Sequence, residues 1–196
     1  MRSTKTVFLS LLCLLVMATI SHAATVSMKL SGPGAVNDST IKAGEKVSFD
    51  VYIENDATRL GFTLGFKMTS DDIKKVVHVA DSGNGLNELG DLKGHNGFHD
   101  ASIWDIFGVM AVESDWDGVL PDTVGFGGLA TKAGYAAGKM EKKLSWECVV
   151  PEAGTLVVDS CFFPPGGKWL FSSPADIADS AYTPGWLGPY KFKVVK

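Results

Sequence analysis

The sequence predicts an all-β protein, built as an antiparallel sandwich of two sheets with about eight or nine strands. Three observations lead to this prediction. Apolar and polar residues alternate with a period of two over short segments, most clearly over residues 47–53 and 62–68. Glycine, proline, asparagine and aspartate gather between these segments as turn signals. Because the pattern contains no long amphipathic helices, the apolar face of each sheet must be covered by another sheet.

Residues 1–23 have the pattern of a secretory signal peptide. Arg2 and Lys5 form a basic start, and residues 7–20 form an apolar run that is too short to span a bilayer. Ser21 and Ala23 place small residues at the positions that signal peptidase recognises. We therefore expect cleavage after Ala23, one domain over residues 24–196, and a secreted protein that is extracellular or periplasmic.

The charge of the chain excludes two classes of partner. The full sequence has a net charge of −4, and removal of Arg2 and Lys5 leaves 16 basic against 22 acidic residues, a net charge of −6. Nucleic acids and anionic membranes select basic surfaces, so neither is an expected partner. No second apolar segment is long enough to cross a membrane, so no transmembrane segment is expected.

The predicted elements of the first half follow one another closely. A strand over 26–30 ends at a Ser-Gly-Pro-Gly turn. The rows 47–53 and 62–68 form a strand pair that seeds the core. The β-branched run 76–79 favours another strand. The polar stretch 81–97 contains five glycines and predicts a surface loop.

The second half of the chain is also predicted to consist of short strands separated by turns. Residues 102–112 and 124–130 have strand-like composition, the second of them rich in glycine. Residues 144–150 and 155–163 alternate on either side of a Pro-Glu-Ala-Gly turn and predict a second hairpin. Residues 190–194 form a last strand, whose alternating lysines suit a solvent face or a protected edge.

The connection between the first two core rows allows two interpretations. Residues 55–60 are polar at their start and join two apolar rows, as in a hairpin. They are also longer than a two-residue hairpin loop requires. A crossover from one sheet to the other is therefore the second interpretation.

Three segments resemble the opening of cohesin-like domains, which are bacterial extracellular β-sandwiches of jelly-roll type. They are residues 41–47 with their Ala-Gly-Glu turn, the strand 49–53, and the Gly-Phe strand 60–66. The resemblance implies a non-catalytic module that binds a protein partner. Related carbohydrate-binding sandwiches share much of the pattern, while residues 81–128 are longer and richer in glycine than the family pattern. No dockerin-binding motif can be matched here residue by residue.

Two cysteines follow the predicted signal peptide, Cys148 and Cys161. In an oxidising compartment they could pair, and closing so short a loop contributes about 3 kcal/mol to stability in the chain-entropy account. However, Cys148 is in step with the apolar residues of its strand and Cys161 is out of step with those of the next. A disulfide that uses a bulge, and two separate thiols, are the two alternatives.

The 81–97 loop is rich in side-chain oxygens. Carboxylate and amide oxygens are the ligands that Ca²⁺ prefers, although the spacing does not match an EF-hand loop. The sequence therefore predicts no cofactor other than a structural calcium ion. Its candidate ligands are Asp81, Asn84, Glu88 and Asp91.

Tryptophans in turns are the candidate ligand-binding residues. Trp146 alternates with core residues, whereas Trp116, Trp169 and Trp186 stand beside glycine, proline or aspartate. Exposed indole rings can stack on sugar rings or anchor a protein interface. They make a polysaccharide the alternative to an extracellular protein partner.

Signals for catalysis are largely missing. The sequence has no Gly-x-Ser-x-Gly, His-Glu-x-x-His or phosphate-binding glycine motif. Asp115, Asp117 and Asp122 could form a glycosidase pair, but acids at glycine and proline turns are ordinary turn formers. The sequence therefore predicts a secreted non-catalytic module for protein–protein interaction, with a carbohydrate-binding module as the alternative and a glycoside hydrolase as a third possibility.

Overall fold

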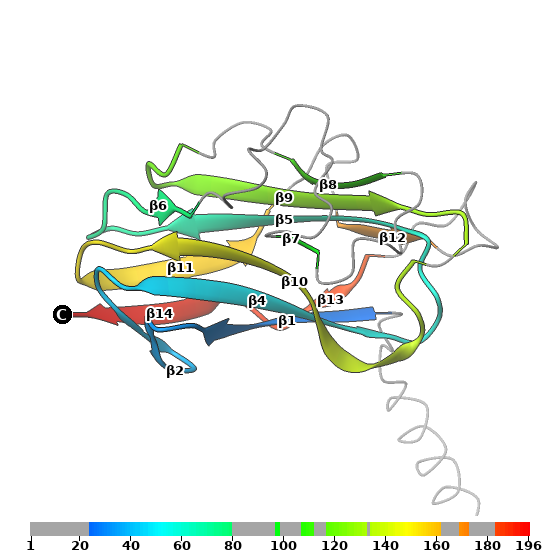
Figure 1. Ribbon diagram of the computed structural model, residues 1–196, viewed down its shortest axis with the longest axis horizontal. Helices are drawn as coiled ribbons and strands as arrows, with labels where there is room; N and C mark the ends of the chain where they lie inside the picture. Colours follow the sequence, from blue (N-terminus) through cyan, green and yellow to red (C-terminus); the bar gives the residue numbers. More distant parts are fainter. Residues whose placement is uncertain are drawn as a thin grey trace, which may run out of the picture.

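A computed structural model describes residues 24–79, 97–98, 107–111, 117–132, 134–161, 169–172 and 183–196. They form two β-sheets packed face to face, and no helix occurs in these ranges (Figure 1). The predicted all-β sandwich is confirmed. Within the same ranges, no helix has the length and apolar character needed to cross a membrane.

The strands differ widely in length. Those of five residues or more number eight, close to the prediction, and the others are pieces of two or three residues. The bounds are β1 Ala24–Ser31, β2 Ala35–Asn37, β3 Thr40–Lys42, β4 Lys46–Asn55, β5 Gly61–Thr69, β6 Val77–His78, β7 Gly97–Phe98, β8 Phe107–Ala111, β9 Asp122–Leu129, β10 Gly138–Val149, β11 Gly154–Ser160, β12 Leu170–Ser172, β13 Gly185–Trp186 and β14 Tyr190–Val195.

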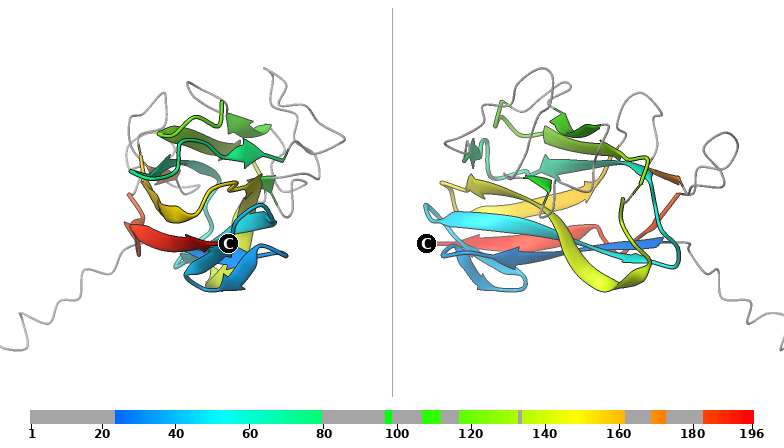
Figure 2. Two further views of the ribbon diagram at one scale, coloured as in Figure 1. Left: turned by 90° about the vertical axis from the view of Figure 1, so that its left-hand side faces the viewer. Right: turned by 45° about the vertical axis from the view of Figure 1, so that its right-hand side comes forward.

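One sheet, here sheet A, has the order β13-β1-β4-β10-β6, with β7 beside β10. The other, sheet B, has the order β2-β3-β14-β11-β5-β9-β8, with β12 beside β5. Neighbouring strands are antiparallel except for β1 with β13 and β3 with β14. Seen from the end, β14 and β11 lie on one side of the molecule and β4 and β10 on the other (Figure 2).

The two rows that open the core lie in different sheets. Val47, Phe49, Val51 and Ile53 point inward from β4 in sheet A, and the matching row of β5 points inward from sheet B. Residues 56–60 therefore cross between the sheets, and the hairpin interpretation is wrong. The crossover is the arrangement that lets the two apolar rows cover each other.

The predicted second hairpin is also a crossover. β10 lies in sheet A and β11 in sheet B, so the alternating rows 144–150 and 155–160 face each other across the core. Alternation shows which side chains share a face, but it is the same whether two strands pair or face each other. The turn before β4 helps to hold this end, since the amides of Ala43 and Gly44 donate to the carbonyls of Val195 and Val150, one on each sheet.

Trp146 lies at the centre of the core, as predicted. Its ring is stacked on Phe49, with centroids 5.2 Å apart, and lies against Phe66 at 5.2 Å and Phe126 at 6.0 Å. These rings come from both sheets. Among the described residues no acceptor lies within hydrogen-bonding distance of the buried Trp146 Nε1.

Trp169 has a different role, because it closes a break in sheet B. β11 and β12 pair with the same edge of β5, and the ladder is interrupted between them at Gly65. The carbonyl of Gly65 accepts hydrogen bonds from the amide of Cys161 at 2.9 Å and from Trp169 Nε1 at 2.8 Å. Trp169 Nε1 also lies 3.1 Å from the carbonyl of Cys161. The indole thus adds a second hydrogen bond to the carbonyl of Gly65 and supplies a donor to the carbonyl of Cys161 at the interrupted ladder.

We expect Trp169→Phe to destabilise the protein more than Trp146→Phe, by about 1 kcal/mol or more, although Trp146 is the more deeply buried ring. Both changes remove the same atoms. Trp169→Phe removes the Nε1 donor shared by the carbonyls of Cys161 and Gly65, whereas Trp146→Phe removes a buried N–H that has no acceptor among the described residues. Urea unfolding of the two variants gives the difference directly.

The two alanine variants are the controls. Trp146→Ala and Trp169→Ala should each lose about 3–5 kcal/mol, because both leave a large cavity. If the two phenylalanine variants lose equal stability, the hydrogen bonds of Trp169 do not hold the sheet break together.

Candidate functional site

The outer face of sheet B is divided into a covered half and an open half. In the covered half, the outward positions of β5 and β9 are largely glycine, and Gly65, Gly125 and Gly127 are buried. A partner has no access to these positions in this structure. The other half, over β14, β11 and the ends of β5 and β9, is open to solvent.

We name the open half the lysine–threonine face. Its side chains are polar or small and come from four neighbouring strands, which hold them on a firm backbone. Val157 is its single aliphatic side chain and lies between Lys191 and Thr69 in the register. The residues of the face are Lys67, Thr69, Thr123, Thr155, Val157, Asp159, Lys191 and Lys193.

The three lysines of this face are exposed and have no carboxylate within ion-pair distance among the described residues. Asp159 lies directly across from Lys67 in the register. Its Oδ1 instead accepts from Trp186 Nε1 at 2.9 Å and from the Ser160 amide at 2.7 Å. The face is therefore basic, on a chain whose net charge is −4.

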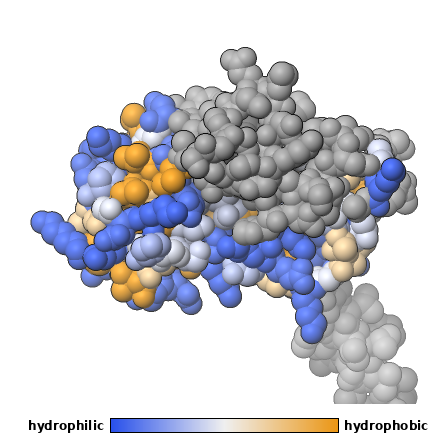
Figure 3. Space-filling view, viewed as in Figure 1, coloured by the Kyte–Doolittle hydropathy of each residue, from blue (hydrophilic) through white to orange (hydrophobic). Residues whose placement is uncertain are grey.

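The outer face of sheet A is different, because most of its lysines contact a carboxylate or an aromatic ring. Lys142 Nζ lies 3.1 Å from Asp50, and Lys46 Nζ lies 3.0 Å from Glu147. Lys29 Nζ lies 5.1 Å from the centre of the Tyr52 ring, within the range of a cation–π contact. Figure 3 shows this side of the molecule, where the described surface over β4 and β10 is mainly hydrophilic.

A small apolar patch lies at the edge of sheet A, near β6. Val77 is 51% and Val119 57% exposed, and Val149 lies across from Val77. Lys75 and Val119 form a bridge between the segments that carry the patch. The orange surface at the left of Figure 3 covers this region. Two exposed valines are within the normal range for a soluble domain and do not by themselves form a site.

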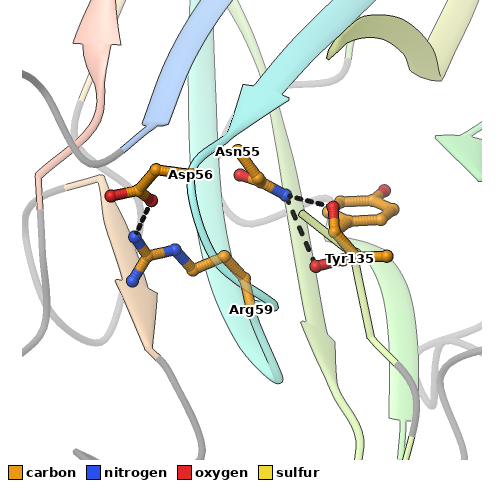
Figure 4. Close-up of polar contacts among 5 residues, drawn as sticks. Asn55, Asp56, Arg59 and Tyr135 are labelled. Atoms are coloured by element: carbon orange, nitrogen blue, oxygen red, sulfur yellow. Dashed lines mark hydrogen bonds and ion pairs between the residues drawn. The ribbon is translucent and has the colours of Figure 1, made fainter. Parts of the chain in front are cut away.

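Figure 4 shows the polar contacts that fasten the crossover between β4 and β5. The buried Arg59 makes an ion pair with the exposed Asp56, with Nη2 and Oδ1 2.5 Å apart. The Asn55 side chain donates to the carbonyls of Tyr135 and Ala136, and the backbone of Arg59 pairs with that of Tyr135. A buried cation balanced by a neighbouring acid is a structural arrangement.

Gly134 is required for this closure. It has φ +67°, and a Cβ there would collide with the carbonyl of Arg59. No residue with a side chain fits without moving the crossover.

A His–Asp pair joins the two sheets at one corner. His78 Nε2 of β6 in sheet A lies 2.5 Å from Asp122 Oδ2 of β9 in sheet B, and Asp122 Oδ1 accepts from the Thr123 amide. Asp122 is fully buried and Asp117 Oδ1 accepts from the Val119 amide in a turn. Asp122 is therefore closed to a substrate, and its interpretation as half of a glycosidase pair is wrong. Asp115 lies outside the described residues, so a pair of Asp115 with Asp117 is not tested.

Cys148 lies across from His78, so cysteine, histidine and aspartate meet at this corner. Burial, with a smaller contribution from the charge of Asp122, raises the pKa of the Cys148 thiol to about 12. A fully buried thiol with this pKa is not ionised at neutral pH and cannot act as a nucleophile. The corner therefore has the residue types of a catalytic triad, but its thiol is not available as a nucleophile at neutral pH.

The two cysteines are free thiols, so the disulfide alternative is wrong for this structure. Cys148 points into the core from sheet A, while Cys161 follows β11 in sheet B, and the expected mismatch in orientation is present. The pKa of Cys161 is raised to about 11, mainly by burial.

Of the three predicted tryptophans, the structure describes Trp169 and Trp186. Trp169 is 6% exposed and closes the sheet break, which corrects its prediction as an exposed ring. Trp186 is half-buried against Trp169, Tyr190 and Phe66. Trp116 lies outside the described residues. The exposed large apolar side chains of the described chain are all aliphatic: Val36, Val77, Val119 and Leu187.

The predicted calcium ligands Asp81, Asn84, Glu88 and Asp91 also lie outside the described residues, and this site stays a prediction. Within the described part, no group of three or more His, Cys, Asp or Glu side chains is placed to hold a metal ion.

The lysine–threonine face was missed at the level of sequence. Its signal is the polar row of each core strand, such as Lys67 and Thr69 between the apolar residues of β5. That row was interpreted only as the solvent side. The register that brings it beside Lys191 and Val157 is visible only in the folded sheet.

The raised thiol pKa values predict slow alkylation. At pH 8, iodoacetamide should modify native Cys148 and Cys161 at least about a hundredfold more slowly than in urea, because the unfolded thiols have a pKa near 8.5. The free energy of unfolding should not depend on the two thiols below about pH 8.5. Above about pH 8.5 it should fall as the pH rises, because the unfolded thiols lose their protons while the native thiols keep theirs. Peptide mass spectrometry measures each site, and native Cys148 reacting at the unfolded rate would contradict its burial.

Comparison with known proteins extends the description of the fold. No protein-family model matches the sequence, and the comparison with curated proteins gives no match. Among solved structures, the type II cohesin dyad from the ScaA scaffoldin of Acetivibrio cellulolyticus has a TM-score of 0.53 and 13% identity, over 86% of this chain and 48% of that chain.

Two further structures agree over most of both chains. A type II cohesin in a Cohesin-X-Dockerin complex from Acetivibrio cellulolyticus has a TM-score of 0.52 and 11% identity, over 88% of this chain and 99% of that chain. A type III cohesin module from the ScaE cell-surface anchoring scaffoldin of Ruminococcus flavefaciens has a TM-score of 0.51 and 11% identity, over 89% and 87% of the two chains. The resemblance predicted from residues 41–66 is confirmed as one of structure. The chain has a cohesin-like β-sandwich fold.

Proposed function

We propose that this protein is a secreted, non-catalytic module that binds another protein through the lysine–threonine face. The observation that carries the proposal is this open face, which four strands hold over a fully packed core. Side chains on a firm sheet lose little freedom on binding, and this favours association. The cohesin-like fold supports the proposal, since one structural neighbour is a cohesin bound to an X-dockerin pair.

The chemistry of the described residues also supports binding over catalysis. The single described corner with histidine, aspartate and cysteine is buried, and its thiol is un-ionised at neutral pH. A polysaccharide partner has less support. Rings that stack on sugars must be exposed, and Trp169 and Trp186 are packed against other aromatic side chains.

Photo-crosslinking tests the proposal. A benzoylphenylalanine placed at Val157 reports on the lysine–threonine face, and one at Tyr52 reports on the outer face of sheet A. We expect position 157 to give a discrete crosslinked protein adduct in the native host, and position 52 to give none. The adduct is detected by its mass on a denaturing gel and identified by mass spectrometry.

The crosslinker at Tyr52 is also the control for collision with abundant proteins. Equal adducts at both positions would show non-specific contact. Absence of an adduct at positions 157, 67 and 123 alike would overturn binding through this face.

A further inference from the structure

We propose that the partner presents an acidic protein segment to the lysine–threonine face. This inference rests on the proposed function and names the chemistry of the partner. Its basis is the contrast between the two sheets. Four lysines of sheet A, Lys29, Lys46, Lys142 and Lys143, contact a carboxylate or an aromatic ring, whereas the three lysines of this face have no such partner among the described residues.

The geometry suits several carboxylates at once. Lys191 and Lys193 are alternate residues of β14, so their Cα atoms are about 7 Å apart, and Lys67 lies two strands away, about 10 Å across the sheet. The three ammonium groups therefore form a triangle and not a single point of charge. An acidic segment lying across the strands can reach all three.

The surroundings favour a protein over another polyanion. Thr69, Thr123 and Thr155 offer hydroxyl groups that can donate or accept, and Val157 offers an apolar contact among the lysines. Sulfated glycans and nucleic acids carry charge at close, regular spacing and bind to dense basic surfaces. Three lysines on a chain of net charge −4 do not provide such a surface.

Asp159 does not oppose this binding strongly. It is the one acid of the face, and its Oδ1 is bonded to Trp186 Nε1 and the Ser160 amide. These donors partly offset its charge. The acids Asp71, Asp72 and Glu152 belong to the turns beyond the ends of β5, β10 and β11, outside the triangle of lysines.

The test uses charge reversal with a matched control. The variant Lys67→Glu/Lys191→Glu/Lys193→Glu changes the face, and Lys75→Glu/Lys132→Glu/Lys139→Glu makes the same change in net charge at exposed lysines elsewhere. Fluorescent peptides of alternating Glu-Thr, Gln-Thr and Lys-Thr, and a heparin oligosaccharide, are the probes. Anisotropy at low and high salt measures binding.

We expect the Glu-Thr peptide to bind the wild type and the control alike, with binding weakened by salt. The face variant should bind it about tenfold to a hundredfold more weakly, since three attractive contacts become repulsive. Absence of binding, equal binding to both variants, or preference for heparin over the Glu-Thr peptide would each overturn the inference.

The crosslinked adduct at position 157 separates this inference from the proposed function. If the adduct forms equally well in the face variant, the partner is a protein that does not depend on these lysines, and only the acidic inference fails. If no adduct forms in the wild type at positions 157, 67 and 123 alike, the proposed function fails.

Discussion

The structure depends on one constraint, which is that each sheet has one apolar face and only the other sheet can cover it. No helix in the described ranges takes this role. The chain therefore crosses from sheet A to sheet B after β4 and again after β10. Each crossing places consecutive apolar rows opposite one another, and Trp146 lies where the rows of both sheets meet. Fully burying one such side chain contributes about 1.5–3 kcal/mol, so the facing rows dominate the stability.

The corners of the sandwich follow from the same constraint, because a crossing leaves backbone groups outside the ladders. Arg59 pairs its backbone with Tyr135 beside one crossing, and Gly134 makes the close approach possible. At the opposite edge of sheet A, residues 74–76 bond to the segment before β9, and His78 joins Asp122. These polar contacts lie at the ends and edges, where the apolar layers stop.

The sequence predicted the two-sheet class and the inward rows because both depend on local alternation. The inward side chains are those that the pattern indicates, including Val47, Phe49, Val51, Ile53, Leu156 and Val158. It could not distinguish a hairpin from a crossing, since the period of side-chain orientation is the same in both. The 144–163 hairpin was wrong for this reason.

Other features of the fold cannot be predicted from a local pattern of residues. β2, β3 and β13 have two or three residues, too few for a periodic signal, and β3 and β13 pair with strands distant in sequence. Trp169 lies at the break between β11 and β12, and nothing near Trp169 in the sequence reveals that its indole bonds the carbonyls of Gly65 and Cys161 there. A turn-like neighbourhood therefore suggested an exposed ring where the fold buries one.

The same constraint narrows where function can lie. The inward side chains are buried in the core. A binding surface must therefore consist of outward side chains of the strands, of the corners of the sandwich, or of loops. Of the outward rows, that of sheet A is largely neutralised by its own ion pairs, and the glycine half of sheet B is covered. What is left on the described sheets is the row in which Lys67, Lys191 and Lys193 face solvent without a carboxylate partner. Exposed charges cost the folded chain little when water solvates them, and they are free to attract a partner of opposite charge. The unpaired lysines thus distinguish the lysine–threonine face from the other described sheet surfaces.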